Sequence, residues 1–232
     1  RDERAGTTNA GAWTMLQRAK LATRQGDSAR LANDTATMLR KFALADSTLA
    51  AAAGADPGWP AVPILRGTID YHLSRFYSGD QLRANDWDDK GLVHAAKALQ
   101  IAPRNADAFE LRGTLRYWRW LMATEPDATK AKALLDSARK DLETSTQISP
   151  NQPEAWSVLS HLYYQYSDVV NAKIAARRAY DEDAYLSDAD RIVWRLFTTS
   201  YDLEQFPDAI HWCDVGAGRF PANPRFAECK LW

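Results

Sequence analysis

The sequence predicts an all-α protein, a solenoid in which about five antiparallel helix pairs stack on one another. Two observations predict this fold class. Prolines follow alanine- and leucine-rich stretches at regular intervals, at Pro57, Pro103, Pro150 and Pro221. A short sequence signature also recurs upstream of these stretches, and such self-similarity at a fixed period is typical of repeat proteins.

The spacing of the prolines sets the length of the repeat. Pro57, Pro103 and Pro150 are 46 and 47 residues apart, and the 71 residues from Pro150 to Pro221 leave room for two shorter units. Small or apolar residues stand five, eight and twelve positions before each of the four prolines, which places them on one helical face. The proline then ends the helix, because it cannot continue the backbone hydrogen bonds.

The upstream signature marks the first helix of each pair. Leu65–Tyr71 matches Leu111–Tyr117, with Gly67 and Gly113 in the same place, and looser copies start near residues 12, 155 and 193. Glycine inside a helix costs about 1 kcal/mol relative to alanine. Its return at one position therefore predicts the close approach of a crossing helix.

The combined pattern predicts helices over residues 10–25, 28–54, 61–77, 88–101, 106–123, 128–148, 153–166, 169–184, 188–203, 206–219 and 222–232. We expect residues 1–9 to be flexible and residues 10–232 to form one solenoid domain, with units at about 10–58, 60–105, 106–152, 153–187 and 188–221 and a partial helix at 222–232. The first three units carry extra residues, which lengthen both helices of a pair by a turn or two. The alternative is a long loop, and residues 78–88 are the best candidate for one.

The fourth unit resembles the tetratricopeptide repeat (TPR) in detail. The matching residues, in chain order, are Trp156, Leu159, Ser160, Tyr163, Ala172, Ala176 and Ala179. The likeness covers roughly residues 10–221, although Ala184 stands where the family has a closing proline and the first three units are longer than the family pattern. It implies a right-handed superhelix whose first helices line a concave groove, where the family binds protein or peptide segments.

Carrying the family's groove positions onto this chain gives the candidate binding residues. The twelfth and ninth positions of four units supply a ladder made of Tyr71, Tyr117, Tyr164, Tyr201, Thr68, Thr114, His161 and Thr198. The alternative is that the tyrosines pack between neighbouring first helices. Since Tyr163 precedes Tyr164, the register can also shift by one residue.

Charge at the second and fifth groove positions suggests the kind of ligand. Asp107, Glu110 and Glu154 fall at the middle of the groove, and Arg18 and Arg191 fall toward its ends. This differs from the TPR subtype that uses lysine and asparagine to hold a terminal carboxylate. We therefore expect a segment that is neutral or basic at its middle.

Composition argues against several other classes of function. The 29 basic and 30 acidic residues nearly cancel, so no net field attracts nucleic acid, and no apolar run approaches the roughly 18 residues of a membrane span. The four histidines are far apart in sequence and form no metal motif. The acidic group Asp86, Asp88 and Asp89 is expected to cap a helix rather than to form a catalytic pair. No cofactor and no enzymatic activity are predicted.

The two cysteines leave two possibilities open. Cys213 and Cys229 lie on neighbouring predicted helices, so they form either a disulfide, in an oxidising compartment, or two buried thiols. The chain begins at Arg1, and we expect it to be part of a longer protein. Both a cytoplasmic and an extracytoplasmic domain fit the sequence.

The function predicted from these features is a protein-interaction scaffold that binds a segment in its groove. The alternative is a sensor or regulatory tail of a larger bacterial signalling protein such as a membrane-anchored kinase, because Ala55–Trp59 and Leu65–Gly67 loosely resemble the TPR tails of bacterial serine/threonine kinases. An enzyme with a site in the groove and an oligomerisation surface are two further alternatives. The oligomeric state stays open.

Overall fold

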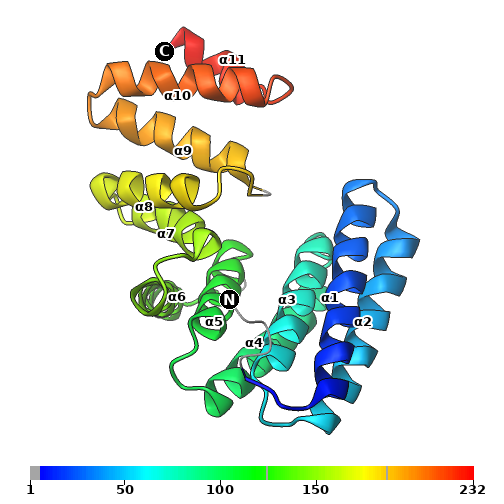
Figure 1. Cartoon of the computed structure of the whole chain (residues 1–232). Helices are drawn as coiled ribbons and strands as arrows, with labels where there is room; N and C mark the ends of the chain where they lie inside the picture. Colours follow the sequence, from blue (N-terminus) through cyan, green and yellow to red (C-terminus); the bar gives the residue numbers. More distant parts are fainter. Residues whose placement is uncertain (1–5, 124, 187) are drawn as a thin grey trace. The chain divides into compact units, whose positions relative to one another are not determined.

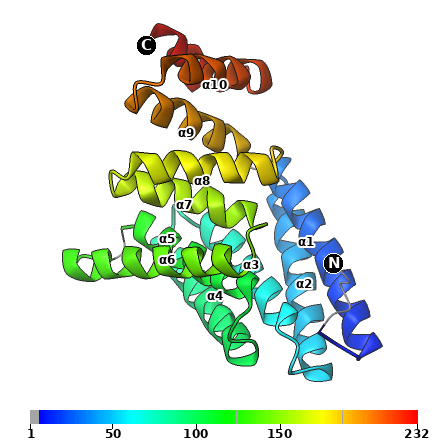
Figure 2. The same ribbon diagram turned by 60° about the vertical axis from the view of Figure 1, so that its left-hand side comes forward.

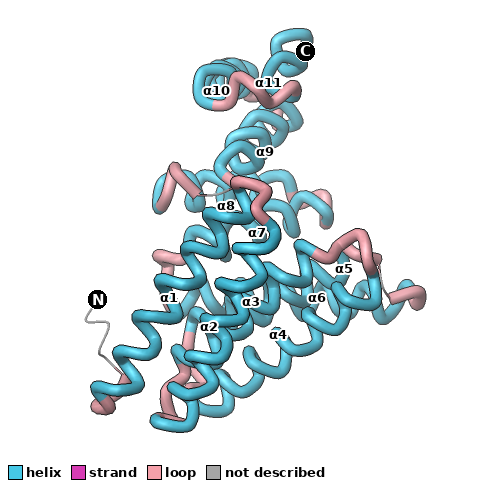
Figure 3. The backbone as a smooth tube through the Cα atoms, turned by 90° about the vertical axis from the view of Figure 1, so that its right-hand side faces the viewer, coloured by secondary structure: helices cyan, strands magenta, loops and turns pink. Residues whose placement is uncertain are grey.

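The computed structural model describes residues 6–123, 125–186 and 188–232, and these residues contain helices and turns but no strand (Figure 1). Short turns join successive helices (Figure 3). The predicted all-α class of paired helices is therefore confirmed. The chain divides into two compact units, Arg1–Pro126 and Asp127–Trp232, and the boundary falls between the two helices that the sequence assigns to the third repeat.

The first unit contains five helices. They are α1 (Ala10–Leu31), α2 (Thr35–Ala55), α3 (Ala61–Phe76), α4 (Gln81–Ile101) and α5 (Ala106–Leu121). Helix α1 pairs with α2 and α3 with α4, while α5 packs on both α3 and α4. Side-chain oxygens of Asn9, Asp34, Asp80 and Asn105 accept hydrogen bonds from the first turns of the helices that follow them, which satisfies amides that lack a helical partner.

The second unit contains the remaining helices (Figure 2). They are α6 (Ala128–Ile148), α7 (Pro153–Gln165), α8 (Val169–Glu182), α9 (Ala189–Asp202), α10 (Phe206–Arg219) and the short α11 (Arg225–Glu228), which a 3-10 turn (Cys229–Leu231) continues. Helix α7 pairs with α8 and α9 with α10, and α7 also contacts α6 and α9. The predicted helix at 222–232 is thus shorter and less regular than expected.

The extra residues of the long units extend their helices, as predicted. Helices α2, α4 and α6 have 21 residues each, whereas α8 and α10 have 14. The difference of seven residues corresponds to about two helical turns. The alternative of a long structureless loop is wrong, since α4 already begins at Gln81.

The predicted break between helices at residues 26–27 is wrong, because α1 continues through it. Gly26 is buried against Phe42, and a Cβ atom built there would lie 2.6 Å from the Phe42 ring. The glycine therefore allows α1 and α2 to approach closely instead of ending the helix. Helix α1 ends at Leu31, and Asn33 follows in the turn with a φ of 57°, in the left-handed region that asparagine adopts more readily than most residues.

The predicted start of helix α4 at residue 88 is also wrong, because α4 begins at Gln81. Asp80 caps α4 by accepting a hydrogen bond from the Arg83 amide, so the acidic group further along lies inside the helix. Asp88 is fully buried there and pairs with Arg119 of α5. The acid that the sequence assigns to a helix cap instead joins two helices.

Close packing at Gly67 confirms the meaning of the repeated signature. A Cβ atom at Gly67 would lie 2.6 Å from Leu111 of α5 and 3.2 Å from the Gly91 carbonyl oxygen of α4. The backbones of α3 and α4 thus approach at a point that a larger residue would obstruct.

The N-terminal residues are described only in part. Of the segment expected to be flexible, residues 1–5 lie outside the described residues. Thr7 donates a hydrogen bond to Asp56, and the Asn9 side chain donates one to the Ala55 carbonyl oxygen. These contacts join the start of α1 to the end of α2.

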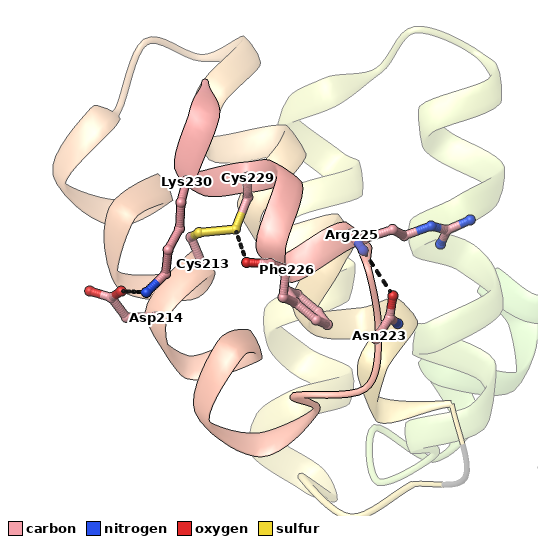
Figure 4. The surroundings of a disulfide bond; sticks show 7 residues. All are labelled: Cys213, Asp214, Asn223, Arg225, Phe226, Cys229 and Lys230. Carbon is pink, nitrogen blue, oxygen red and sulfur yellow. Dashed lines mark hydrogen bonds and ion pairs between the residues drawn. A yellow bond between two sulfur atoms is a disulfide. The ribbon is translucent and has the colours of Figure 1, made fainter.

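A disulfide joins Cys213 of α10 to Cys229, which corresponds to the first of the two possibilities open at the sequence level (Figure 4). The two Cα atoms are 5.9 Å apart, within the usual range for a disulfide. Phe226 is buried beside it, against Gly216 of α10. The bond therefore fastens residues 225–231 to α10.

Candidate ligand-binding surface

The predicted groove residues lie on the first helices of the pairs, and each unit supplies its own set. Helices α3 and α5 carry them in the first unit, and α7 and α9 carry them in the second. Steps of three, four and seven residues keep such side chains on one helical face.

In the first unit, Tyr71 lies at the centre of an aromatic and cationic group. Its half-buried ring meets Trp118 of α5 edge to face at 6.5 Å. The Arg75 guanidinium lies 5.6 Å from the Tyr71 ring centre and 5.8 Å from that of Trp118. Trp118 is fixed in turn by a 2.8 Å hydrogen bond from Nε1 to Ser74 Oγ. The rings therefore have set positions, which suits a preformed contact surface.

Tyr117 does not join this surface. Its side chain is 6% exposed and stacks on Trp120, with ring centres 5.9 Å apart. Little of its area is open to a ligand. The threonines beside these tyrosines, Thr68 and Thr114, are half-buried, and the Thr68 hydroxyl donates to the Ile64 carbonyl oxygen within its own helix.

In the second unit, Tyr164 connects α7 to α9. Its hydroxyl donates a 2.9 Å hydrogen bond to Asp202, and the Arg195 guanidinium lies 4.0 Å from its ring centre. Burial and then the Asp202 carboxylate raise the pKa of the Tyr164 hydroxyl, so it stays a hydrogen-bond donor at neutral pH. The neighbouring Tyr163 faces away toward α6, where it donates to Glu143. This places Tyr164, not Tyr163, on the side of α9.

Tyr201 belongs to an aromatic group farther along α9. Its half-buried ring contacts Phe197, Phe206 and Trp232, with ring centres 6.2, 5.7 and 5.3 Å away. The Trp232 side chain is 56% exposed, and Phe206 is 50% exposed. These two rings therefore leave apolar area open at the edge of the group. Thr198, by contrast, is buried, and its hydroxyl donates to the Arg195 carbonyl oxygen.

His161 of α7 stands close to several positive charges. Burial, and then repulsion from Arg195, Arg191 and Arg225 in that order, lower the pKa of its imidazole to about 4. The imidazole is therefore neutral at physiological pH. Burial also lowers the pKa of Arg195, and the charge of Arg225 adds to this effect.

The predicted acidic centre is divided between the two units. Glu110 is half-buried on α5 of the first unit, and Glu154 is exposed on α7 of the second, and both make contacts of their own. Glu154 lies seven residues before His161, so helical spacing places both on one face of α7.

Solved structures with the same arrangement of helices are TPR proteins. A thermophilic TPR protein from Thermus thermophilus matches with a TM-score of 0.62 and 13% identity over 92% of this chain and 100% of its own. A TPR protein from Parabacteroides merdae matches with a TM-score of 0.53 and 15% identity over 92% of this chain and 71% of its own. YrrB, described as a TPR protein with an unusual peptide-binding site, matches with a TM-score of 0.53 and 14% identity over 98% and 100% of the two chains.

The chain has the TPR fold. No protein-family model matches it, and no curated protein matches its sequence significantly. The TM-scores establish the fold, and at identities of 13–15% the ligand has to be inferred from the residues themselves.

Arg195 and Arg225, the two further arginines near His161, were not among the residues predicted from the sequence. Arg195 follows Arg191 by one helical turn, so the spacing alone places both on one face of α9. The family's groove positions include only Arg191, so Arg195 was passed over. Arg225 comes from α11, and no spacing rule brings it near α7.

The described residues show neither a metal site nor a membrane span. No group of three or more histidine, cysteine or acidic side chains lies close enough together there to hold a metal ion. No described helix combines the length and apolar character that crossing a membrane requires.

Proposed function

We propose that the chain is a protein-interaction scaffold that binds a peptide or protein segment on the faces formed by the first helices of its pairs. The observation that carries this proposal is the arrangement around Tyr164. One aromatic ring, the Arg195 guanidinium and the Asp202 carboxylate are held together between α7 and α9 by a hydrogen bond and a cation–π contact. Such partly buried, rigid aromatic and arginine side chains are the residues that dominate protein-binding surfaces.

Two further observations support the proposal. The first unit repeats the combination of tyrosine, tryptophan and arginine with Tyr71, Trp118 and Arg75. A solved protein of the same fold, YrrB, is described as having a peptide-binding site. A scaffold needs no catalytic group, and we propose no enzymatic activity for this face. The segment it holds would make contacts with half-buried rings and charges, in which burial of aromatic area supplies much of the free energy.

Selection from a random peptide library, displayed on phage and applied to the immobilised full chain, tests this function. We expect a family of related peptides to be enriched. Replacing Tyr164 with alanine should weaken their binding at least about tenfold, as for a binding hot spot. Tyr185→Ala is the matched control, because this tyrosine is 89% exposed in the turn between α8 and α9. A library that yields no related peptides, or equal binding by both variants, contradicts the proposal.

The disulfide favours one version of the alternative function, a sensor domain outside the cytoplasm. Disulfides persist in oxidising compartments and are rare in the cytosol. The Cys213–Cys229 bond therefore supports placing the chain in the extracytoplasmic part of a larger, membrane-anchored signalling protein. Rapid alkylation of the protein in its source cells, followed by mass measurement, tests this. Alkylation of both thiols before reduction contradicts it.

A further inference from the structure

Three arginines of the second unit lie near His161 of α7. Arg191 and Arg195 lie one turn apart on α9, and Arg225 begins α11. Figure 4 shows the Arg225 side chain extending away from the disulfide. All three lower the pKa of the His161 imidazole on α7. Arg225 lies 5.8 Å from the ring centre of Trp194, which is three residues after Arg191 and next to Arg195 on α9, so the three arginines come from one region of the second unit.

None of the three guanidinium groups forms an ion pair with an acidic side chain of the described residues. By contrast, two half-buried arginines of the first unit pair with acids, Arg66 with Asp46 at 2.7 Å and Arg119 with Asp88 at 2.6 Å. Arg195 instead packs over Tyr164, and Arg225 lies 5.8 Å from the Trp194 ring centre. These two guanidinium groups therefore lie beside aromatic rings and are not ion-paired with an acid of the described residues.

The nearby acids already have other partners. The Asp202 carboxylate raises the pKa of Arg195, but its Oδ2 atom accepts the hydrogen bond from Tyr164. Asp190 accepts from the Asn223 side chain, and Asp188 accepts from Ser157. Removing a positive charge from water without a partner costs free energy. Of the three arginines only Arg195 is half-buried, whereas Arg191 and Arg225 are exposed, so an anion bound beside Arg195 would recover part of that cost.

We propose that Arg191, Arg195 and Arg225 form a recognition site for the side-chain carboxylates of an acidic peptide segment. The proposal rests on the scaffold function and specifies the chemistry of its ligand in the second unit. Guanidinium groups fit carboxylates with two parallel hydrogen bonds, and the contact of Arg195 with the Tyr164 ring, 4.0 Å from its centre, limits the freedom that Arg195 loses on binding. The exposed ring of Trp232 and the half-buried ring of Trp194 supply apolar area for the rest of a polypeptide. The sequence predicts a neutral or basic segment because of acids such as Glu154, whereas this site would bind an acidic one.

Fluorescence anisotropy with the full chain tests this site. The probes are a short labelled peptide rich in glutamate, its glutamine analogue and a phosphoserine analogue. We expect the glutamate peptide to bind at least about tenfold more tightly than the glutamine analogue, since hydrogen bonds between charged groups are stronger than those to a neutral amide. Binding should weaken as salt is added. A phosphoserine analogue that binds more than tenfold more tightly than the glutamate peptide overturns the assignment to carboxylates.

Substitutions connect the binding to the cluster. Arg195→Gln and Arg225→Gln should each weaken the glutamate peptide about tenfold. Arg178→Gln is the matched control, because Arg178 is exposed on α8, and it should leave binding unchanged. Equal binding by all three variants overturns the proposal.

The His161 imidazole provides a second readout that does not depend on affinity. Its pKa, followed by NMR, should rise on addition of the glutamate peptide, because carboxylates oppose the arginine charges that lower it. Arg195→Gln should raise the same pKa without peptide. A His161 pKa that stays constant on saturation with the peptide contradicts the proposal. If peptides bind through Tyr164 whatever their charge, the carboxylate site is wrong and the scaffold function stands. If no peptide binds at all, the scaffold function itself is refuted.

Discussion

Among single residues, Asp88 makes the stability of the first unit depend on pH. Its carboxylate is fully buried and pairs with Arg119, while its Oδ1 atom has no hydrogen-bond partner among the described residues. Burial raises the pKa of Asp88 from 3.8 to about 6, against the opposing charge of Arg119. The native state thus holds the Asp88 proton more tightly than the unfolded chain does.

This predicts the sign of a pH effect. The stabilisation from the Asp88 proton is present below pH 4 and is lost as the pH rises through about 6, a change of about 3 kcal/mol at most. Asp88→Asn should remove this slope from the free energy of unfolding, measured by urea denaturation between pH 4 and 7. Asp89→Asn is the control, because Asp89 is exposed and contacts the same arginine. An unchanged slope in Asp88→Asn contradicts the account.

Single positions also show how far the sequence could predict the surface. The groove register placed Tyr71 and Tyr164 on first helices, where both meet arginine and polar groups. The same register included Tyr117 and Thr198, which are buried. A position in a repeat fixes the helical face of a side chain, but its exposure depends on which neighbouring side chains cover it. Trp120, which stacks on Tyr117, follows it by only three residues, and nothing in the repeat pattern marks the contact.

At the scale of helices, the course of α1 can be tested with two glycines. Gly26 contacts the Phe42 ring so closely that a methyl group requires a shift, whereas no atom lies within 4 Å of the Cβ position at Gly54. Gly26→Ala should therefore lower the free energy of unfolding by about 1–3 kcal/mol through overpacking. Gly54→Ala should raise it by about 0.5–1 kcal/mol through helix propensity. Thermal denaturation of both variants checks this, and stabilisation by Gly26→Ala contradicts the packing described.

The disulfide makes a prediction for α11 and the turn that follows it. Cys213 and Cys229 are 16 residues apart, and closing a loop of this size stabilises a protein by about 3 kcal/mol in the chain-entropy account. Adding a reductant should lower the urea midpoint of the transition that includes α10. The double variant Cys213→Ala, Cys229→Ala should not respond to the reductant. A wild-type midpoint that reductant leaves unchanged contradicts the prediction.

Helix ends were predictable where proline sets them and less so where glycine stands. The ends of α2, α4 and α6 fall just before Pro57, Pro103 and Pro150, because proline cannot continue the helix in any surroundings. Gly26 and Gly79 both fall between predicted helices, but only Gly79 lies in a turn. Glycine serves equally for a turn and for close packing, and the choice depends on whether a ring such as Phe42 fills the space.

At the scale of the whole chain, each unit has its own buried core. In the first unit this core includes Leu16, Phe42 and Leu49, and in the second it includes Ile192, Leu196 and Trp212. The predicted single domain of residues 10–232 remains a proposal. Because each core is built from residues of one unit, fragments 1–126 and 127–232 should each fold when expressed separately. Circular dichroism should show a helical spectrum and a cooperative melt for both, and a fragment without a cooperative melt contradicts the division.

The claim that the first helices carry the ligand surface is tested most directly by NMR with a peptide from the library. Backbone amide shifts would be recorded for the full chain during titration. The account predicts that the largest changes fall on α7 and α9, around His161, Tyr164 and Arg195, while α8 and α10 change little. Largest changes on the second helices, α8 and α10, would contradict it.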